Sequence, residues 1–412
     1  MKINKEHIAY LENNYGGNIL PLSKLENEYY PGTSPLEILF FWNRESTVSE
    51  VKASLLKTIE HYNLFSSRLI MIDDNKFALQ YCTDGAELHF LPPIHAVYDD
   101  LNIDDIKKMI VTFKTLPGKS LFVVTDIPII GGRFVGIRCS HAVGDAFSLL
   151  LFCFAWKCII EGNDFPRPSS QRLFKGKPIH SDKIDKVFIP PLSELSSQIH
   201  NRIHRGENFK KYITREYFTD EYFNDVKNQA KSENEKYIIS NNQIMTSFLL
   251  KKYHRHILPD ANRIRLRTPV NLRDVHPDID SLYIGNAYID SFTEFTGNEI
   301  DEMSIPQIAY RLKESIHNAR NENLIKGVSY VSKYGIEFKT DAFEKFPPYS
   351  VDTDIVSTNL SHVSDPDALG MSSNLVRVLD MSATVPTSFI VLKEKSGEMF
   401  AQVTSRYPLD LV

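Results

Sequence analysis

Cysteine is scarce in this 412-residue chain, which has only Cys82, Cys139, Cys153 and Cys158. No two of them form a CxxC pair, and their spacing does not suit a zinc site. Three of the four lie in or beside an apolar stretch, where cysteine usually packs as a small hydrophobic residue. We therefore expect a reducing compartment and a cytoplasmic location.

The chain also lacks a long uninterrupted hydrophobic run. The longest, AFSLLLFCFAWKCII, contains Lys157 and is shorter than the roughly 20 residues that a membrane-spanning helix needs. The N-terminal stretch MKINKEHIAYLENNYGG has no apolar run typical of a signal peptide. We expect a soluble protein that is not bound to a membrane.

A strong excess of one charge sign is missing as well. The formal net charge is −5, with 42% hydrophobic and 24% charged residues, which is an ordinary globular composition. This balance gives no support to a nucleic-acid partner. No P-loop or dinucleotide fingerprint is present, and His254 and His256 have no third ligand nearby, so we expect neither a bound cofactor nor a metal.

Strand-like and helix-like segments alternate with hairpin signals along the chain, which favours an α/β fold with two lobes. We predict an N-terminal lobe over 1–165, a crossover linker rich in Pro, Ser and charge over 166–210, and a C-terminal lobe over 211–412. Helices are expected from Thr47 or Ser49, from Ser240 or Asn241, and in 220–230 and 305–320. Strands are expected in 36–42, 68–73, 76–82, 120–130, 133–140, 212–218, 263–273, 353–359 and 387–405.

The most apolar part of the chain places polar residues at the junction of two elements. GIRCSHAVGDAFSLLLF begins as a strand and continues after Asp145 as a helix, with Gly162 as its C-cap. His141 lies where the strand ends, and Gly144 permits a tight turn. A neutral imidazole in apolar surroundings has a lowered pKa and can take a proton from a hydroxyl or amine attacking a carbonyl. Asp145 could orient His141, cap the helix or pair with an arginine.

This junction and its surroundings resemble the BAHD acyltransferases, within the wider superfamily of CoA-dependent acyltransferases and condensation domains. SHAVGDAFSLLLFCFAW resembles the family's HxxxD(G) motif, about a third of the way along the chain. Four more segments agree in order: PLSKLE, LLKTIEHYNLFSSRL, RTPVNLRDVHP and LYIGNAY. The family's DFGWG is replaced by a segment with Asp367 and Gly370 and no tryptophan, and Ser140 and Ala146 replace two residues of the condensation-domain motif.

The resemblance implies two chloramphenicol-acetyltransferase-like lobes, each a mixed sheet with flanking helices, with a central tunnel between them. Acyl-CoA would enter from one face and the acceptor from the other, with His141 midway as general base. Asp145 would turn away from His141 into a structural salt bridge, and Arg273 would pair with Asp367. The resemblance also implies a monomer that uses acyl-CoA as a co-substrate.

Two further tasks in such a site can be assigned to candidate residues. Thr358 or Asn359 could donate a hydrogen bond to an oxyanion, the alternative being a polar strand end with satisfied side chains. Arg263, Arg265 and Arg267 would share one strand face and could contact CoA phosphates, the alternative being a solvated face. Ser361, His362 and Asp365 are too close in sequence to form a typical triad.

The function that these features favour is acyl transfer from acyl-CoA to a hydroxyl or amine of a small molecule, without a covalent enzyme intermediate. Two alternatives stay open. One is condensation-type transfer from the thioester of an acyl carrier protein, and the other is a catalytically degenerate binding module.

Overall fold

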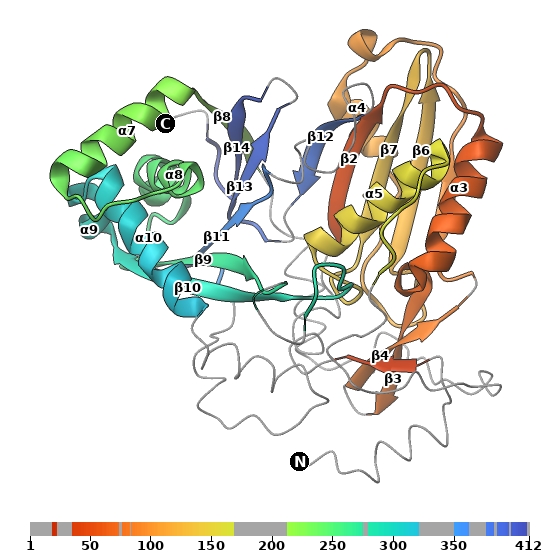
Figure 1. The fold of residues 1–412 in the computed structure, drawn as a ribbon, viewed down its shortest axis with the longest axis horizontal. Coiled ribbons are helices and arrows are strands. Elements are labelled where there is room, and N and C mark those ends of the chain that lie inside the picture. The colour runs from red at the N-terminus through yellow and green to blue at the C-terminus, as the bar shows by residue number, and fades with distance from the viewer. Residues whose placement is uncertain are drawn as a thin grey trace.

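The computed structural model describes residues 19–22, 35–73, 76–82, 84–168, 212–273, 275, 279–320, 350–361, 376–382, 385–394 and 397–409. In this part of the chain, two mixed β-sheets carry helices on their faces, and a small three-stranded sheet lies below the first lobe in the view of Figure 1. The predicted mixed α/β fold with two sheet-containing lobes is confirmed.

The first lobe is a five-stranded sheet of order β12-β2-β7-β6-β5. Its strands β2, β7 and β6 are antiparallel neighbours, and β5 runs parallel to β6. Helices α3 and α5 cover one face, where they share a core with β2, β6 and β7, and α4 covers the other. The elements from the N-terminal half are β2 (Leu36–Trp42), α3 (Val48–His61), β5 (Glu87–Phe90), α4 (Ile103–Met109), β6 (Phe122–Ile129), β7 (Gly132–Cys139) and α5 (Ala146–Glu161).

Local sequence signals set the boundaries of these elements. Thr47 caps α3 in a capping box with Glu50, which confirms one of the two expected start residues. The indole of Trp156 on α5 donates a hydrogen bond of 2.9 Å to Ser54 on α3 and so joins the two helices. The expected hairpin forms β3 (Ser67–Asp73) and β4 (Lys76–Tyr81), which β1 (Ile19–Pro21) extends to the small sheet; 3₁₀ turns span Asn63–Ser66 and Tyr98–Asp100.

The second lobe is a six-stranded sheet of order β10-β9-β11-β13-β14-β8. Strands β9, β11 and β13 are parallel neighbours, and the other pairs are antiparallel. The strands are β8 (Tyr212–Phe218), β9 (Arg263–Asn271), β10 (Tyr288–Thr296), β11 (Asp354–Asn359), β13 (Ser388–Lys393) and β14 (Met399–Ser405). The helices are α7 (Asp220–Glu233), α8 (Asn241–Ile257), α9 (Gly297–Glu302) and α10 (Ile305–Ala319).

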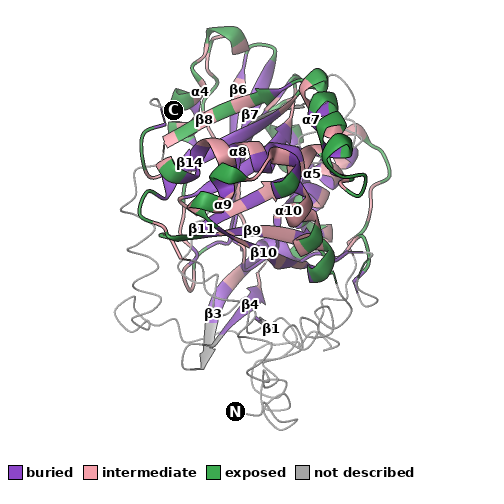
Figure 2. Cartoon of the chain, turned by 90° about the vertical axis from the view of Figure 1, so that its left-hand side faces the viewer, coloured by how far each residue is buried: buried purple, intermediate pink, exposed green. Residues whose placement is uncertain are grey.

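The four helices lie on the outer side of this second sheet (Figure 2). The other side of the sheet faces the first lobe (Figure 1). Ser240 and Ser304 start α8 and α10 in capping boxes, so the first of them confirms an expected cap. Buried residues of the helices and of alternate strand positions form one core, which fixes which side chains of each strand point inward.

The two lobes share structure at their junction. Strand β12 (Val376–Ser382), from the C-terminal half, pairs antiparallel with β2 and completes the first sheet. Residues 211–412, predicted as the C-terminal lobe, therefore contribute one strand to the sheet of the first lobe, where β12 covers the edge of β2. Ile390, Leu392 and Phe400 of the second sheet also join the core of the first lobe.

Most of the predicted crossover, 166–210, lies outside the described residues. At its start, the Tyr62 hydroxyl donates a hydrogen bond of 2.6 Å to the carbonyl of Pro166. In the described part of the chain, no helix combines the length and hydrophobicity that crossing a membrane requires.

Candidate active site

The strand-to-helix junction predicted from the sequence is present between β7 and α5. β7 ends at Cys139 and α5 begins directly after Asp145, so His141 lies in the turn between them. Asp145 is the N-cap of α5, because its Oδ1 accepts a hydrogen bond of 2.9 Å from the Ser148 N–H. Gly162 ends the helix in the left-handed conformation, with φ 75°, as expected.

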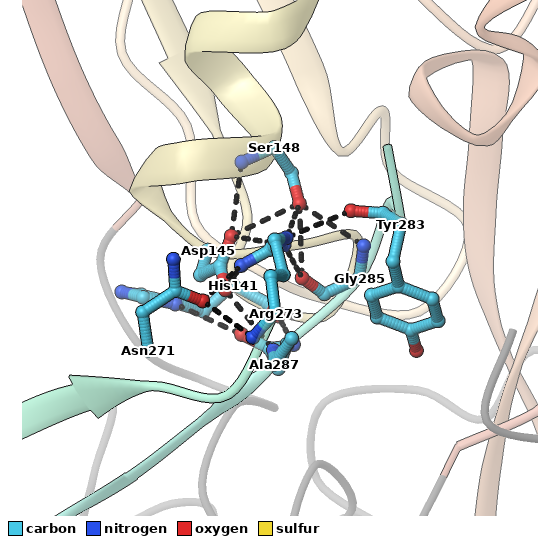
Figure 3. A network of polar contacts seen from close by, with 9 residues as sticks. His141, Asp145, Ser148, Asn271, Arg273, Tyr283, Gly285 and Ala287 are labelled. Atoms are coloured by element: carbon cyan, nitrogen blue, oxygen red, sulfur yellow. Dashed lines mark hydrogen bonds and ion pairs between the residues drawn. The ribbon is translucent and has the colours of Figure 1, made fainter. Parts of the chain in front are cut away.

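Asp145 also forms a buried ion pair with Arg273, which comes from the C-terminal half of the chain (Figure 3). Arg273 Nη1 lies 2.8 Å from Oδ2 and Nη2 lies 2.9 Å from Oδ1. The N–H of Ala287 donates to Oδ2 at 3.0 Å. Burial alone would raise the pKa of Asp145, but Arg273 and the N–H donors outweigh it, so the pKa lies below its ordinary value.

Of the three roles left open for Asp145, the structure therefore shows helix capping and arginine pairing. Its two carboxylate oxygens accept bonds from Arg273, Ser148 and Ala287. The acceptor beside the imidazole Nδ1 of His141 is a different residue, Asn286.

Among the described residues, the carboxylate that pairs with Arg273 is Asp145. Asp367, the partner that the resemblance implied, lies outside the described residues. The guanidinium also donates to the hydroxyl of Ser148 at 3.0 Å and to the carbonyls of Tyr283 at 3.0 Å and Gly285 at 3.1 Å. The pairing of Arg273 with Asp367 that the resemblance implied stays a prediction.

Two glycines let the turn and the loop after Arg273 approach each other closely. A Cβ at Gly144 would come within 2.8 Å of Ser148 Cβ and 2.9 Å of its Oγ, so space rather than a positive φ requires glycine there. Gly285 has φ 143°, a conformation that other residues rarely adopt. Its carbonyl accepts a hydrogen bond of 2.9 Å from the Ser148 hydroxyl.

Asn286 fixes the proton arrangement of the imidazole. Its side-chain Nδ2 donates a hydrogen bond of 2.6 Å to the backbone carbonyl of His141, which sets the orientation of the amide. The amide Oδ1 then lies 3.4 Å from the imidazole Nδ1 and can only accept a hydrogen bond, so Nδ1 carries the proton. Nε2 is consequently the nitrogen with the basic lone pair.

The surroundings of His141 keep the imidazole uncharged. Burial lowers its pKa, and the opposing effects of the Asn286 hydrogen bond and of the charges on Asp145 and Asp290 do not compensate. The residue is nevertheless partly exposed, and the ring of Tyr288 lies edge-on to it, with 6.5 Å between ring centroids.

The three arginines of β9 share one face of the strand, as predicted, but their charges are compensated within the sheet. Each pairs with a carboxylate from a neighbouring strand, so this face gives no support to a site for CoA phosphates. The pairs are Arg263 with Glu294, Arg265 with Asp354 at 2.7 Å, and Arg267 with Asp290 at 2.6 Å.

The end of β11 holds the two residues suggested for oxyanion stabilisation. Asn359 Oδ1 accepts a hydrogen bond of 3.0 Å from the N–H of Ser361, which fits the alternative of a satisfied strand end. Thr358 is partly exposed and lies opposite Ile390, whose side chain packs in the core shared with the first lobe. Its role at an oxyanion stays a prediction.

The other polar groups singled out in the sequence do not join this site. His362 and Asp365 lie outside the described residues. The imidazole Nδ1 of His254 lies 3.0 Å from the carbonyl of Leu250, and its Nε2 lies 3.4 Å from Asp301. Within the described ranges, no three His, Cys, Asp or Glu side chains lie together so as to hold a metal ion.

The fold is that of a two-lobed α/β protein with a histidine in the turn between a strand and a helix of the first lobe. The chain belongs to the Transferase family, that of the BAHD acyltransferases, which it matches over residues 3–364. The spermidine coumaroyl-CoA acyltransferase of Arabidopsis thaliana is 23% identical over 339 residues, covering 74% of this chain and 70% of the relative.

Solved structures support the same fold. TRI101 of F. sporotrichioides, crystallised with coenzyme A and T-2, superposes with a TM-score of 0.64 over 94% of this chain and 95% of its own, at 13% identity. Vinorine synthase gives a TM-score of 0.63 over 95% of this chain and 92% of its own, at 16% identity.

Several residues of the site escaped the sequence analysis as individuals. Ser148 lies within the quoted junction segment, whereas Gly285, Asn286 and Ala287 come from the segment LYIGNAY, which was noticed only through its resemblance to a family loop. That segment was the available signal. Its distance from the junction along the chain concealed the contacts.

Proposed function

We propose that this protein transfers an acyl group from acyl-CoA to a hydroxyl or amine of a small molecule, with His141 as the general base. The observation that carries the proposal is the fixed tautomer of His141. Because Asn286 accepts the Nδ1–H, Nε2 carries the basic lone pair of a partly exposed, uncharged ring.

In the proposed reaction, Nε2 of His141 moves one proton. Nε2 takes the proton of the acceptor as the oxygen or nitrogen attacks the thioester carbonyl, and a tetrahedral oxyanion forms. The carbon–sulfur bond then breaks, and the imidazolium of His141 returns the proton to the CoA thiolate. No covalent enzyme intermediate is needed, and Thr358 is our candidate for a hydrogen-bond donor to the oxyanion.

Two comparisons support acyl-CoA as the donor. The Arabidopsis relative is named as a coumaroyl-CoA acyltransferase, and TRI101 was crystallised with coenzyme A. We propose a tunnel between the lobes for acyl-CoA and acceptor, and a monomer in the cytoplasm, where all four cysteines, which are free thiols, would stay reduced.

The test is thiol release by the purified protein. Acetyl-, malonyl- and longer acyl-CoAs are offered with panels of alcohols and amines, and free CoA is measured with a thiol reagent. We expect release that depends on both substrates, and a loss of at least roughly 10²-fold in His141→Ala. His317→Ala is the matched control, because His317 is exposed in the last turn of α10.

The outcomes separate the alternatives. Unchanged turnover in a folded His141→Ala variant would refute the mechanism. Binding of CoA or acceptor without any thiol release would support a binding module. Release only from a carrier-protein thioester, and not from any acyl-CoA, would support condensation-type transfer.

A further inference from the structure

Strand β10 continues the row of side chains that begins beside His141. Asn286 and Tyr288 both approach the imidazole, at 3.4 Å between polar atoms and 6.5 Å between ring centroids. Side chains alternate along a strand, so Asp290 points to the same side as Tyr288. A carboxylate is thereby placed next along the strand from the candidate base.

Asp290 differs from the other carboxylates near the site in having an oxygen without a partner. Both bonds from Arg267 go to its Oδ2, at 3.1 Å from Nε and 2.6 Å from Nη2. Among the described residues, none donates a hydrogen bond to its Oδ1. In contrast, both oxygens of Asp145 and both oxygens of Asp354 accept hydrogen bonds.

The open oxygen also lies at one end of an alternating row of charges. Arg265 pairs with Asp354, Arg267 lies between Asp354 at 3.5 Å and Asp290 at 2.6 Å, and Asp290 follows as the last member. The positive charge of Arg267 is thus shared by two carboxylates. The end of the row nearest His141 is negative, and the Asp290 side chain is 17% exposed there.

A cation bound at Asp290 Oδ1 would continue the alternation of positive and negative charges along this row. The carboxylate supplies a charge-assisted acceptor, and the adjacent ring of Tyr288 offers a face that attracts cations. An uncharged His141 adds no repulsion. Asp290 lies two residues along β10 from Tyr288, whose ring approaches His141, and its charge acts on the pKa of the imidazole.

We propose that Asp290 Oδ1 binds a protonated amine of the acceptor while a second nitrogen or a hydroxyl of the same molecule lies at His141. This inference rests on the proposed function and specifies its acceptor class, an amine with a separate nucleophile. The nucleophilic amine reacts in its neutral form. Its N–H proton passes to Nε2, the C–N bond forms, the C–S bond breaks, and the proton passes on to the CoA thiolate. The anchoring ammonium keeps its proton and is not acylated.

The experiment compares acceptors that differ only in the anchoring group. Butane-1,4-diamine, 4-aminobutan-1-ol and butan-1-amine are each titrated with acetyl-CoA as donor, in the wild type, Asp290→Asn and Glu294→Gln. Glu294 is the matched control, because it lies on the same strand and face and also pairs with an arginine. Binding of the diamine is measured separately by calorimetry in the absence of acyl-CoA.

We expect the diamine to have a kcat/KM at least roughly tenfold above that of butan-1-amine in the wild type and in Glu294→Gln. In Asp290→Asn this preference should disappear through a higher KM for the diamine, so that the kcat/KM of the diamine divided by that of butan-1-amine falls to about one. The asparagine oxygen still accepts from Arg267, and thermal unfolding checks that the variant is folded.

Equal use of diamine and monoamine by the wild type, or an unchanged preference in Asp290→Asn, would overturn the inference while leaving acyl transfer intact. Calorimetric binding of the diamine that Asp290→Asn abolishes, without any thiol release from the wild type, would support the cation site and refute the proposed function. Absence of both binding and turnover would refute both.

Discussion

Removing the charge of Asp145 should destabilise the whole protein rather than only the turn around His141. The substitution with the clearest interpretation is Asp145→Asn, because the amide keeps an oxygen that can accept the Ser148 N–H and thus preserves the helix cap. What it removes is the partner of Arg273, whose side chain is 2% exposed. Asp145→Ala removes the cap as well.

The magnitude follows from the burial of the pair. Breaking a buried ion pair by removing one partner costs about 3–5 kcal/mol, because the remaining charge stays buried without compensation. The guanidinium also donates to uncharged acceptors, among them the carbonyls of Tyr283 and Gly285, which soften the loss, so we expect about 3 kcal/mol for Asp145→Asn. Asp145→Ala should lose about 1 kcal/mol more through the missing cap.

The assay is urea unfolding followed by circular dichroism, in a double-mutant cycle with Arg273→Met. The double variant Asp145→Asn/Arg273→Met should be less destabilised than the sum of the single variants by about 1–3 kcal/mol, since neither charge is left alone. Asp105→Asn serves as the control, because its partner Lys108 is an exposed residue and no measurable change is expected.

The pH dependence gives an independent check with a definite sign. The folded-state pKa of Asp145 lies below its ordinary value, so its stabilisation is fully present above about pH 4 and is lost as the pH falls through the lowered pKa. Asp145→Asn should flatten that part of the acid-unfolding curve. Strictly additive single variants, or an unfolding free energy for Asp145→Asn within about 0.5 kcal/mol of the wild type, would refute the reasoning.

Two further predictions concern the same junction. Asn286→Ala should reduce kcat by roughly 10²-fold with little change in Tm, because Nδ1 loses its fixed acceptor. Asn286→Asp should move the acidic limb of the kcat/KM profile to higher pH, because a carboxylate stabilises the imidazolium form of His141. Identical pH profiles for the wild type and Asn286→Asp would contradict this second expectation. Gly144→Ala should lower the unfolding free energy, measured in urea, by about 1–3 kcal/mol, because the added Cβ would lie 2.8 Å from Ser148 Cβ. An unchanged unfolding free energy would contradict this prediction and would mean that α5 can shift to make room.

The sequence was informative where the relevant forces act between neighbours along the chain. The strand, turn and helix around His141 follow from the local hydrophobic pattern and were predicted, as was the cap at Gly162. Capping was one of the three roles left open for Asp145. Thr47 and Ser240 were each one of two expected caps, and the structure selects them through capping boxes. Each depends on residues within a few positions of one another.

The predictions failed where partners come from distant parts of the chain. Nothing in the local pattern of β12 indicates that it pairs with β2 in the first lobe. No local pattern indicated that Arg273 pairs with Asp145, which lies 128 residues away. The arginines of β9 alternate as expected, but only the register with β10 and β11 reveals that carboxylates face them.

The loop after Arg273 explains why the site depends on both halves of the chain. Three consecutive residues reach the junction in different ways: Gly285 bonds to Ser148, Asn286 to His141, and Ala287 to Asp145. The carboxylate of Asp145 therefore holds this loop, and the uncharged amide of Asn286 lies beside the imidazole of His141. A carboxylate in that position would raise the pKa of His141, whereas the amide fixes the tautomer, and burial holds the pKa below its ordinary value. The Asp145–Arg273 ion pair and the imidazole of His141 are therefore joined by one loop, so a substitution that displaces this loop should change the tautomer of His141 as well as the stability.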